Sequence, residues 1–415
     1  MAGALLGVTF LSGYADDTTA APAIRVFNCD QKVQSHKRGL CENHMSEADF
    51  RAFAPGVSWF YNWHYKTDDL PPSDVSMEFL PMAWGNRPGD LEGLDTYLSG
   101  AAKMPRVVMA INEPNLKDQA FIKPEVTADL YKKIKAVADK YHVTVMGPNM
   151  SLGSPSNGSI TAMDPIENKQ VTYTFMVPFL KAFLYYTGDT EVPALGMHSY
   201  GSVGELKWAV ETLHKEFNRP VWVTEYAEYH AGTTQEARDY LIQATDFLER
   251  TPYVQGYAWF KERANDNDKI SLLAPESGKL SYLGEAYVAM PCHDADVYYR
   301  IPGKLPAGNY VSIDKADIMS TAHNDLLVSA TAIDATVDYN IQVDMTGSYK
   351  LGLRVFGTGK IDILEKDQVV ASVDANASEV QTIETTASLP AGPQTLRIRF
   401  GGSGIILSSI EFTKQ

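Results

Sequence analysis

The sequence predicts two domains of different fold class, a (β/α)8 barrel of the TIM type followed by an all-β sandwich. Three observations lead to this prediction. Short apolar runs alternate with amphipathic helical patterns from residue 56 to about residue 260. These runs are apolar throughout, as is typical of strands covered on both faces. After Met290 the helical patterns stop, and short alternating runs separated by turns rich in proline and glycine follow.

Seven of the apolar runs are predicted to be strands. Strands joined through helices form right-handed βαβ units with a parallel sheet, and roughly 240 residues in this rhythm suit a barrel. The eighth strand is not evident, and residues 24–29 or a degenerate unit between Trp84 and Arg106 are the candidates. An open doubly wound sheet is the alternative, although no glycine-rich phosphate-binding motif follows any run. The predicted strands span residues 56–63, 77–84, 106–112, 143–149, 194–199, 220–226 and 254–260, and the clearest helices span residues 124–141, 172–187, 203–217 and 234–250.

The predicted domain boundaries follow these changes of pattern: a leader over residues 1–22, the barrel over 23–291 and the sandwich over 296–415. The first fifteen residues resemble the apolar core of a signal peptide, with small residues before Asp16. A basic start is missing, because Arg25 is the first positive charge, so a truncated leader and a plain apolar N-terminus are the alternatives. We expect a secreted protein, either extracellular or periplasmic.

Composition limits the partners of the chain. The 36 basic and 51 acidic residues give a formal net charge of -15, which argues against nucleic acid or an anionic membrane as partner and suits a neutral one. No run approaches the roughly 20 apolar residues of a membrane span. We therefore expect a chain that binds neither nucleic acid nor membrane, and we also expect a monomer.

Three cysteines are present, Cys29, Cys41 and Cys292. A disulfide between Cys29 and Cys41 would pin an N-terminal loop, as suits an oxidising compartment, and three unpaired thiols are the alternative. No spacing of cysteine and histidine resembles a zinc site, so no catalytic metal is predicted.

Two glutamates follow apolar runs on separate predicted strands. Glu113 stands in the segment INEP (111–114) and Glu225 in the segment VTEY (223–226). Catalytic groups of barrel enzymes lie at the C-terminal ends of strands. A glycosidase needs two such carboxylates, one to protonate the leaving oxygen and one to attack or support the anomeric carbon. Each glutamate alone could be a polar turn or a helix cap, but the pair predicts a glycosidase.

Polar neighbours of the two glutamates are candidate contacts. Asn112 could donate to a sugar 2-hydroxyl, a contact that strengthens in the transition state. Tyr200 and Tyr226 are candidate hydrogen-bond donors. His198 could bind substrate or orient Glu225, and a structural histidine is the alternative.

Aromatic residues gather on the same predicted strands. Sugar rings present C–H faces that stack on indole and phenol rings, so such a set predicts a glycan-binding groove. The alternative is that some of them are core residues, because side chains alternate between the two faces of a strand. The candidate groove residues are Trp59, Tyr61, Trp63, Trp84 and Trp259.

Seven segments are distinctive: VSWFYNW (57–63), EFLPMAWG (78–85), NEP (112–114), VMGPN (145–149), WVTEY (222–226), LL (272–273) and GKLSYLGEAY (278–287). Together they resemble glycoside hydrolase family 128 over roughly residues 50–290. This resemblance implies a retaining β-1,3-glucanase on a (β/α)8 barrel, with Glu113 as general acid/base and Glu225 as nucleophile. It also implies that Asn112 contacts the sugar and that the tryptophans line a β-1,3-glucan groove.

The C-terminal region is similar to family 6 and family 35 carbohydrate-binding modules, through VDYNI (337–341), GSYKLGLRV (347–355) and LPAG (389–392). This similarity implies a structural calcium ion and glycan binding through loop aromatics. The region contains no tryptophan, so Tyr298, Tyr299 and Phe356 are the stacking candidates. A purely structural role is the alternative.

The combined prediction is a secreted endo-β-1,3-glucanase that acts by double displacement and needs no cofactor for catalysis. A related retaining glycosidase acting on xylan, mannan or a mixed-linkage glucan would keep both glutamates and change only the groove. A non-catalytic glucan-binding protein is the alternative from a different class, although a pure binder has no use for the glutamate pair.

Overall fold

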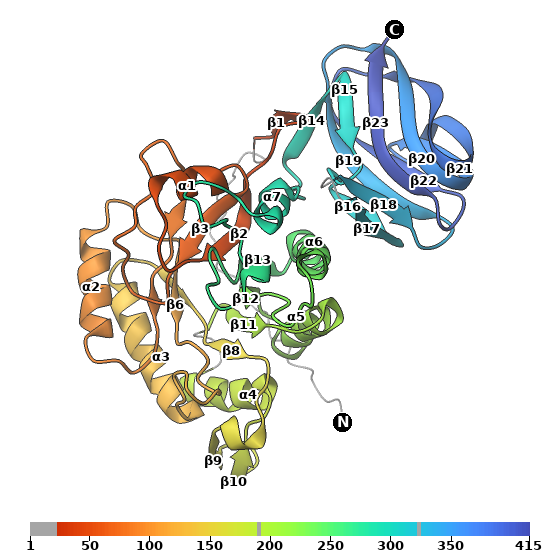
Figure 1. Ribbon diagram of the computed structural model, residues 1–415. Helices are drawn as coiled ribbons and strands as arrows, with labels where there is room; N and C mark the ends of the chain where they lie inside the picture. The colour runs from red at the N-terminus through yellow and green to blue at the C-terminus, as the bar shows by residue number, and fades with distance from the viewer. Residues whose placement is uncertain (1–22, 189–191, 322–324) are drawn as a thin grey trace, which may run out of the picture.

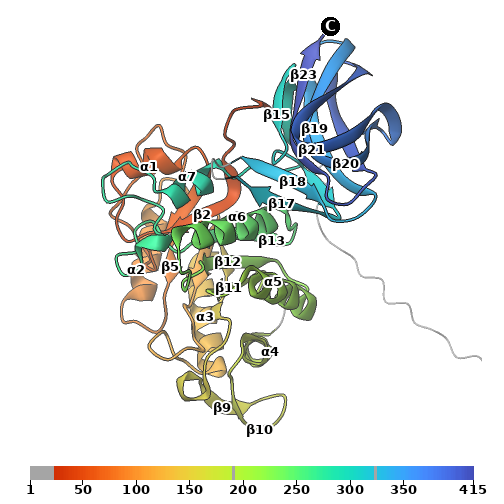
Figure 2. The same ribbon diagram turned by 45° about the vertical axis from the view of Figure 1, so that its right-hand side comes forward.

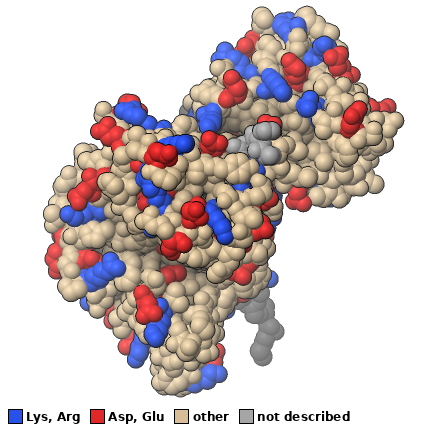
Figure 3. Space-filling model, viewed as in Figure 1, with Lys and Arg blue, Asp and Glu red and all other residues tan. Residues whose placement is uncertain are grey.

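The structure is a computed structural model that describes residues 23–188, 192–321 and 325–415. An α/β domain comes first and a mainly β domain follows it, as the colour ramp in Figure 1 shows. On the face drawn in Figure 3, acidic and basic side chains are interspersed over both domains. Among the described residues, no helix combines the length and the apolar character needed to cross a membrane.

The first domain is built on a ring of parallel strands. The ring closes because β13 pairs in parallel with β2, and β2 pairs in parallel with β3. Two of the eight strand positions are split into short pieces, β4 with β5 and β7 with β8. The parallel sheet and all seven predicted strands are confirmed. In ring order the strands are β2 (Ser35–Cys41), β3 (Val57–Tyr61), β4 (Glu78–Phe79), β5 (Met82–Ala83), β6 (Val107–Ala110), β7 (Thr144–Met146), β8 (Asn149–Ser151), β11 (Leu195–Ser199), β12 (Val221–Tyr226) and β13 (Val254–Trp259).

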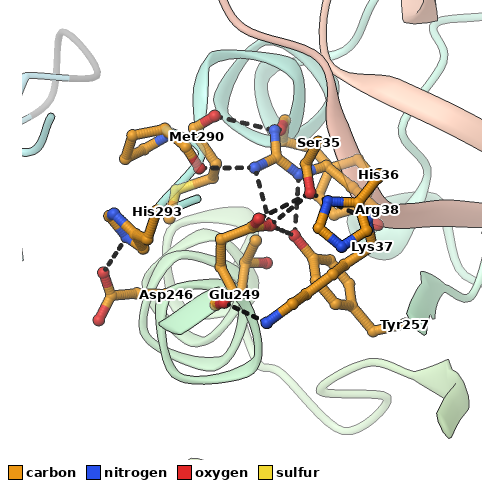
Figure 4. Close-up of polar contacts among 12 residues, drawn as sticks. Ser35, His36, Lys37, Arg38, Asp246, Glu249, Tyr257, Met290 and His293 are labelled. Carbon is orange, nitrogen blue, oxygen red and sulfur yellow. Dashed lines mark hydrogen bonds and ion pairs between the residues drawn. The ribbon is translucent and has the colours of Figure 1, made fainter. Parts of the chain in front are cut away.

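The missing eighth strand is β2, and both candidates from the sequence are wrong. Residues 25–28 form β1 (Arg25–Asn28), which pairs with β14 of the second domain. The unit between Trp84 and Arg106 holds the helix α2 and no strand. The sequence of β2, SHKRGLC, is too polar to read as a buried strand, yet Ser35, Lys37 and Arg38 are all buried. Their polar groups are satisfied by Glu249 and Tyr257 on neighbouring elements (Figure 4).

Within the described ranges, seven α-helices follow the strands, and the segment 62–77 between β3 and β4 contains none. Several start at a side-chain cap, as at Ser46 of α1 and Thr233 of α6, where a capping box satisfies free N–H groups of the first turn. A hairpin of β9 (Thr161–Asp164) and β10 (Lys169–Thr172) extends the connection between β8 and α4. The helices are α1 (Glu47–Phe53), α2 (Asp90–Gly100), α3 (Pro124–Asp139), α4 (Met176–Thr187), α5 (Val203–Phe217), α6 (Thr234–Arg250) and α7 (Tyr282–Ala289).

The second domain is one connected sheet of eleven strands, mostly antiparallel. Two of its pairings are parallel, β1 with β14 and β14 with β19. The long β20 pairs with β23 over residues 349–356 and with β22 over residues 361–365, so it changes partner along its length. A mainly β C-terminal region is confirmed, and the sandwich stays a prediction. The strands are β14 (Val297–Ile301), β15 (Gly303–Pro306), β16 (Ser312–Asp314), β17 (Ala316–Ser320), β18 (Leu326–Ala330), β19 (Ala335–Val343), β20 (Gly347–Glu365), β21 (Gln368–Leu389), β22 (Gly392–Phe400) and β23 (Ile406–Lys414).

The two domains share a polar contact along α6, which lies beside β17 (Figure 2). His293, in the connecting segment, is 3.2 Å from Asp246 of α6 through Nε2 and 2.7 Å from the carbonyl of Tyr310 through Nδ1. The Tyr310 hydroxyl also donates to Asp246 at 2.5 Å. Because β1 belongs to the second sheet, the chain enters the barrel later than the predicted boundary at residue 23.

The predicted disulfide is wrong. All three cysteines are free and buried, as the alternative prediction had it. Cys29 lies beside the second domain, where its thiol donates to the carbonyl of Arg300 at 3.2 Å. Cys41 lies inside the barrel, where its thiol is 3.3 Å from the carbonyl of Thr224. The two thiols therefore belong to different packing regions.

Candidate active site

The chain around Glu113 is held in an unusual backbone conformation at the C-terminal end of β6. Ile111 has φ 59° and Glu113 has φ 41°. A β-branched residue rarely adopts positive φ, and such strain persists only where the surroundings enforce it, often at functional sites. Here the N–H of Asn112 donates to the carbonyl of Trp84 and the N–H of Glu113 to that of Asn149, both at 2.7 Å. The neighbouring strands thus fix the position of the Glu113 carboxyl, which is 6% exposed.

Glu225 lies in β12 and is held by three donors. Its Oε1 accepts from the indole N–H of Trp63 at 2.6 Å and from the hydroxyl of Tyr61 at 3.1 Å. Its Oε2 accepts from the hydroxyl of Tyr200. Burial and then the Glu225 charge raise the pKa of Tyr200 well above its usual value, and burial with nearby groups does the same for the pKa of Tyr61. Both tyrosines therefore remain donors.

His198 connects the two glutamates. Its Nδ1 is 3.0 Å from Oε1 of Glu113 and 3.4 Å from Oε2 of Glu225. These two carboxylate oxygens are therefore at most the sum of those distances apart, about 6.4 Å. Burial opposes a charge on the imidazole, but Glu225 and Glu113 outweigh it, and the pKa of His198 lies above its ordinary value.

The other side of the imidazole is held by a directed chain of hydrogen bonds. The Nδ2 of Asn149 donates to the carbonyl of Ala110 at 3.1 Å, so its Oδ1 is the atom that accepts from the Thr224 hydroxyl at 2.8 Å. The Thr224 oxygen then accepts from Nε2 of His198 at 3.1 Å. Because Nε2 carries a proton, the 3.0 Å hydrogen bond between Nδ1 and Oε1 of Glu113 requires a second one. This proton is carried either by Nδ1 or by the carboxyl group. Glu113 thus has a proton-exchanging neighbour.

Six of the predicted site residues meet at this place, namely Glu113, Glu225, His198, Tyr200, Tyr61 and Trp63. Asn112 is next to them and buried, and its Nδ2 donates to Oε1 of Gln119 at 3.1 Å. Its Oδ1 has no hydrogen-bond partner in the described part of the chain. Trp84 lies at the strand end, with the guanidinium of Arg87 centred 3.7 Å from its ring centroid.

Three of the predicted contact residues are wrong, because their side chains lie in the core with essentially no exposed surface and bind groups other than the two glutamates: Trp59, Tyr226 and Trp259. Tyr61 is equally buried, so it contacts Glu225 but does not line a groove. Trp59 points into the barrel, where it packs edge-on against Trp222. Tyr226 follows Glu225 and points to the opposite face of β12, where its hydroxyl meets that of Thr245 at 2.8 Å. The indole N–H of Trp259 donates to the carbonyl of Ile270 at 2.7 Å.

A hollow of about 480 Å³ lies beside the glutamate pair, where His198 and Tyr200 line it, and extends to Trp208 of α5. Of its lining residues, only His198 and Tyr200 were predicted from the sequence. Thr224 and Asn149, which position His198, were also missed as site residues, although both are polar residues at strand ends and could have been found by that signal. Trp208 has no such signal, because it lies in a helix. The hollow is lined by Ser151, Leu152, Gly153, Phe175, His198, Tyr200, Gly201, Glu205 and Trp208.

Within the described residues, one group of side chains has the spacing of metal ligands: Glu249, Cys292 and Asp294. It lies away from the glutamate pair, between β2 and α6. The Glu249 carboxylate already accepts from Arg38 and Ser35, as Figure 4 shows. A cation there would have to displace a buried guanidinium, so these donors do not fit a metal.

A family model described as the glycosyl hydrolase catalytic core matches residues 39–287. The chain belongs to this family. No curated protein sequence matches the chain. The match covers the barrel with Glu113 and Glu225, and the second domain lies outside it.

Solved structures place this glycosyl hydrolase core in family 128. A subgroup II endo-β-1,3-glucanase from Sorangium cellulosum is 30% identical, with a TM-score of 0.54, over 62% of this chain and 100% of that chain. The subgroup II enzyme from Pseudomonas viridiflava is 29% identical, with a TM-score of 0.53, over 63% of this chain and 100% of that chain. The family and its hydrolase class, predicted from the sequence, are thereby confirmed.

Proposed function

We propose that the chain is an endo-β-1,3-glucanase that hydrolyses its substrate with retention. The observation that carries this proposal is the meeting of Glu113 and Glu225 at His198, with two of their oxygens at most about 6.4 Å apart. Retaining enzymes hold the two carboxyls at about 5–5.5 Å and inverting ones at about 6.5–9.5 Å. The two subgroup II relatives are both described as endo-β-1,3-glucanases, which supports the substrate class.

In the proposed reaction Glu113 protonates the glycosidic oxygen while Glu225 attacks the anomeric carbon. Glu113 then takes a proton from water, which attacks the glycosyl-enzyme and releases Glu225. The donors Trp63, Tyr61 and Tyr200 hold Glu225 for attack in one orientation. His198 supplies and accepts protons beside Glu113 as the latter changes role.

Asn112 is the proposed contact to the sugar beside the reacting bond. Its unpartnered Oδ1 is a buried acceptor next to Glu113, so a substrate hydroxyl would satisfy it. A buried amide oxygen without a partner costs free energy, and this cost disappears when substrate binds. The proposed hydrolysis needs no cofactor.

Reducing-sugar release from linear β-1,3-glucan tests the proposal, with xylan, mannan and cellulose as comparison substrates. We expect release from β-1,3-glucan alone, and a loss of at least about 10,000-fold in the Glu225→Gln variant. Glu228→Gln, three residues further along the chain, is the matched control and should keep full activity. Release from another glycan instead would reassign the substrate. No release from any glycan, with tight glucan binding, would favour the non-catalytic binding protein.

Three further predictions from the sequence remain proposals. Secretion depends on residues 1–22, which lie outside the described residues. The chain is proposed to be a monomer. In the described part of the second domain, no three carboxylate, histidine or cysteine ligand atoms lie within 4.8 Å of one another, so a calcium ion there would depend on backbone carbonyls.

A further inference from the structure

A pair of stacked aromatic rings, one exposed and one half-buried, lies beside the proposed active site. Trp208 is on α5 and is 52% exposed. Its indole stacks on the ring of Phe175, the residue that precedes α4, with the centroids 5.5 Å apart and an angle of 27° between the planes. An indole held this way offers a fixed flat face to solvent.

The core packing of α5 does not explain Trp208. The buried residues of this helix, Leu206, Ala209, Val210 and Leu213, form one stripe at the spacing of helical turns. Trp208 is two positions from Leu206, about 200° around the helix, and so lies on the opposite side. Its position is therefore fixed by stacking on Phe175 and not by the core packing of α5.

The pair is continuous with the glutamate site. His198 and Tyr200, which contact Glu113 and Glu225, line the same hollow as Phe175 and Trp208. A chain bound at the glutamates can therefore extend along this hollow to the indole without leaving the surface.

The hollow also has the mixed chemistry that a sugar ring requires. Phe175, Trp208 and Leu152 are its apolar lining residues, and Glu205 lines it as well. A pyranose ring stacks its C–H face on an aromatic plane and directs its hydroxyls to acceptors at the edge. A neutral glycan suits these groups better than an anion, which Glu205 would repel.

We infer that Phe175 and Trp208 form a glucosyl subsite away from the scissile bond, which gives the enzyme its preference for longer β-1,3-glucan chains. This inference rests on the proposed function. The subsite lies between α5 and the ends of the strands β8 and β11. It is filled only when the glucan chain is long enough to extend from the glutamates to the indole. Oligosaccharides too short to reach it gain nothing from it.

Kinetics on β-1,3-gluco-oligosaccharides of three to seven glucose units test the inference. We expect Trp208→Ala to lower kcat/KM about 10-fold on the longest oligosaccharides, the scale of one lost aromatic contact, and much less on the shortest. Trp208→Phe should recover most of the loss, because it keeps a stacking face. The matched control is Tyr185→Ala on α4, which removes an aromatic residue that is 63% exposed and lies outside the hollow. It should match the wild type at every length.

An equal loss at all lengths, or no loss at any, would overturn the subsite. A wild type that hydrolyses none of the oligosaccharides would instead contradict the proposed function. In that case calorimetric titration with laminarihexaose decides the subsite alone. Weaker binding to Trp208→Ala than to Tyr185→Ala would support it, and equal binding would overturn it.

Discussion

Two buried glutamates of this protein, Glu225 and Glu249, lie in similar surroundings and differ in one respect. Each accepts a hydrogen bond from a buried tyrosine, Glu225 from Tyr61 and Glu249 from Tyr257. Glu249 also lies 3.3 Å from the guanidinium of Arg38, whereas the nearest titratable base to Glu225 is His198, at 3.4 Å.

This difference separates a structural carboxylate from a reactive one. The Arg38 charge is permanent, and its other donors bind the carbonyls of Tyr287, Met290 and Pro291. The pair thereby ties β2 and α6 to the end of α7, as Figure 4 shows for part of it. The imidazole of His198 can gain or lose its charge, and a hollow of about 480 Å³ lies beside it. A buried carboxylate is available for chemistry where its partner can change charge.

The largest effect should come from the glutamate pair itself. Glu113→Gln removes the acid/base and should lower β-1,3-glucan hydrolysis by about 1,000-fold, within the range of general acid–base catalysis. A substrate with a nitrophenolate leaving group needs no acid, so its first step should persist and added azide should speed turnover. Steady-state rates with and without azide measure this. If azide instead rescued Glu225→Gln and gave a product with the anomeric configuration of the substrate, Glu225 would be the acid/base and Glu113 the nucleophile.

The next largest effect should fall on stability. Glu249→Ala leaves the buried Arg38 without its carboxylate and should lower the free energy of unfolding by about 3–5 kcal/mol. Denaturant unfolding measures the change, and activity per folded molecule should stay close to wild type. Ser35→Ala, which removes only one donor to Glu249, should cost about 1 kcal/mol. Equal losses of stability in Glu249→Ala and Ser35→Ala would contradict the prediction that the Glu249 carboxylate is needed to compensate the Arg38 charge.

A smaller and opposite effect is expected at Glu42, which follows β2. Both its carboxyl oxygens are buried and have no hydrogen-bond partner among the described residues. Burial first, then the charges of Asp69 and Glu262, raise the pKa of Glu42 from 4.5 to about 8. The folded chain thus holds a proton that the unfolded chain releases, so stability is lost as the pH rises from 4.5 through about 8.

Glu42→Gln removes this loss. The variant should be more stable than the wild type at pH 9 by about 1–3 kcal/mol and similar to it at pH 4. Melting temperatures across this range test the prediction. The exposed loop variant Glu276→Gln should follow the wild type throughout. A variant less stable than the wild type at pH 9 would mean that the Glu42 charge is compensated.

The smallest effect should be the pH dependence that His198 contributes. Because its folded pKa is raised, its stabilisation is present below about 6.5 and is lost as the pH rises through the folded pKa. The stability difference between wild type and His198→Gln should therefore shrink toward alkaline pH. The effect is small because burial offsets much of the attraction of the glutamates. His230→Gln, in an exposed loop, is the control for melting curves, and a constant difference would contradict the prediction.

The strands of the barrel could be predicted from the sequence wherever their buried residues are apolar. β2 could not, because its charged side chains are buried only through the contacts of Arg38 and Lys37 with α6 and α7. The same limit applies to the aromatics. Trp63 and Trp59 are on the same predicted strand, but only the former reaches Glu225.

The sequence by itself determined the parallel α/β pattern, the β region after it and the two glutamates at strand ends. These are local signals, since apolar runs and strand ends depend on neighbours along the chain. The tertiary structure alone decided that His198 joins the glutamates, that Trp259 is core and that Trp208 reaches the hollow. Those outcomes depend on strand register and ring closure, which bring together residues far apart in the sequence and decide which face of each strand or helix they share.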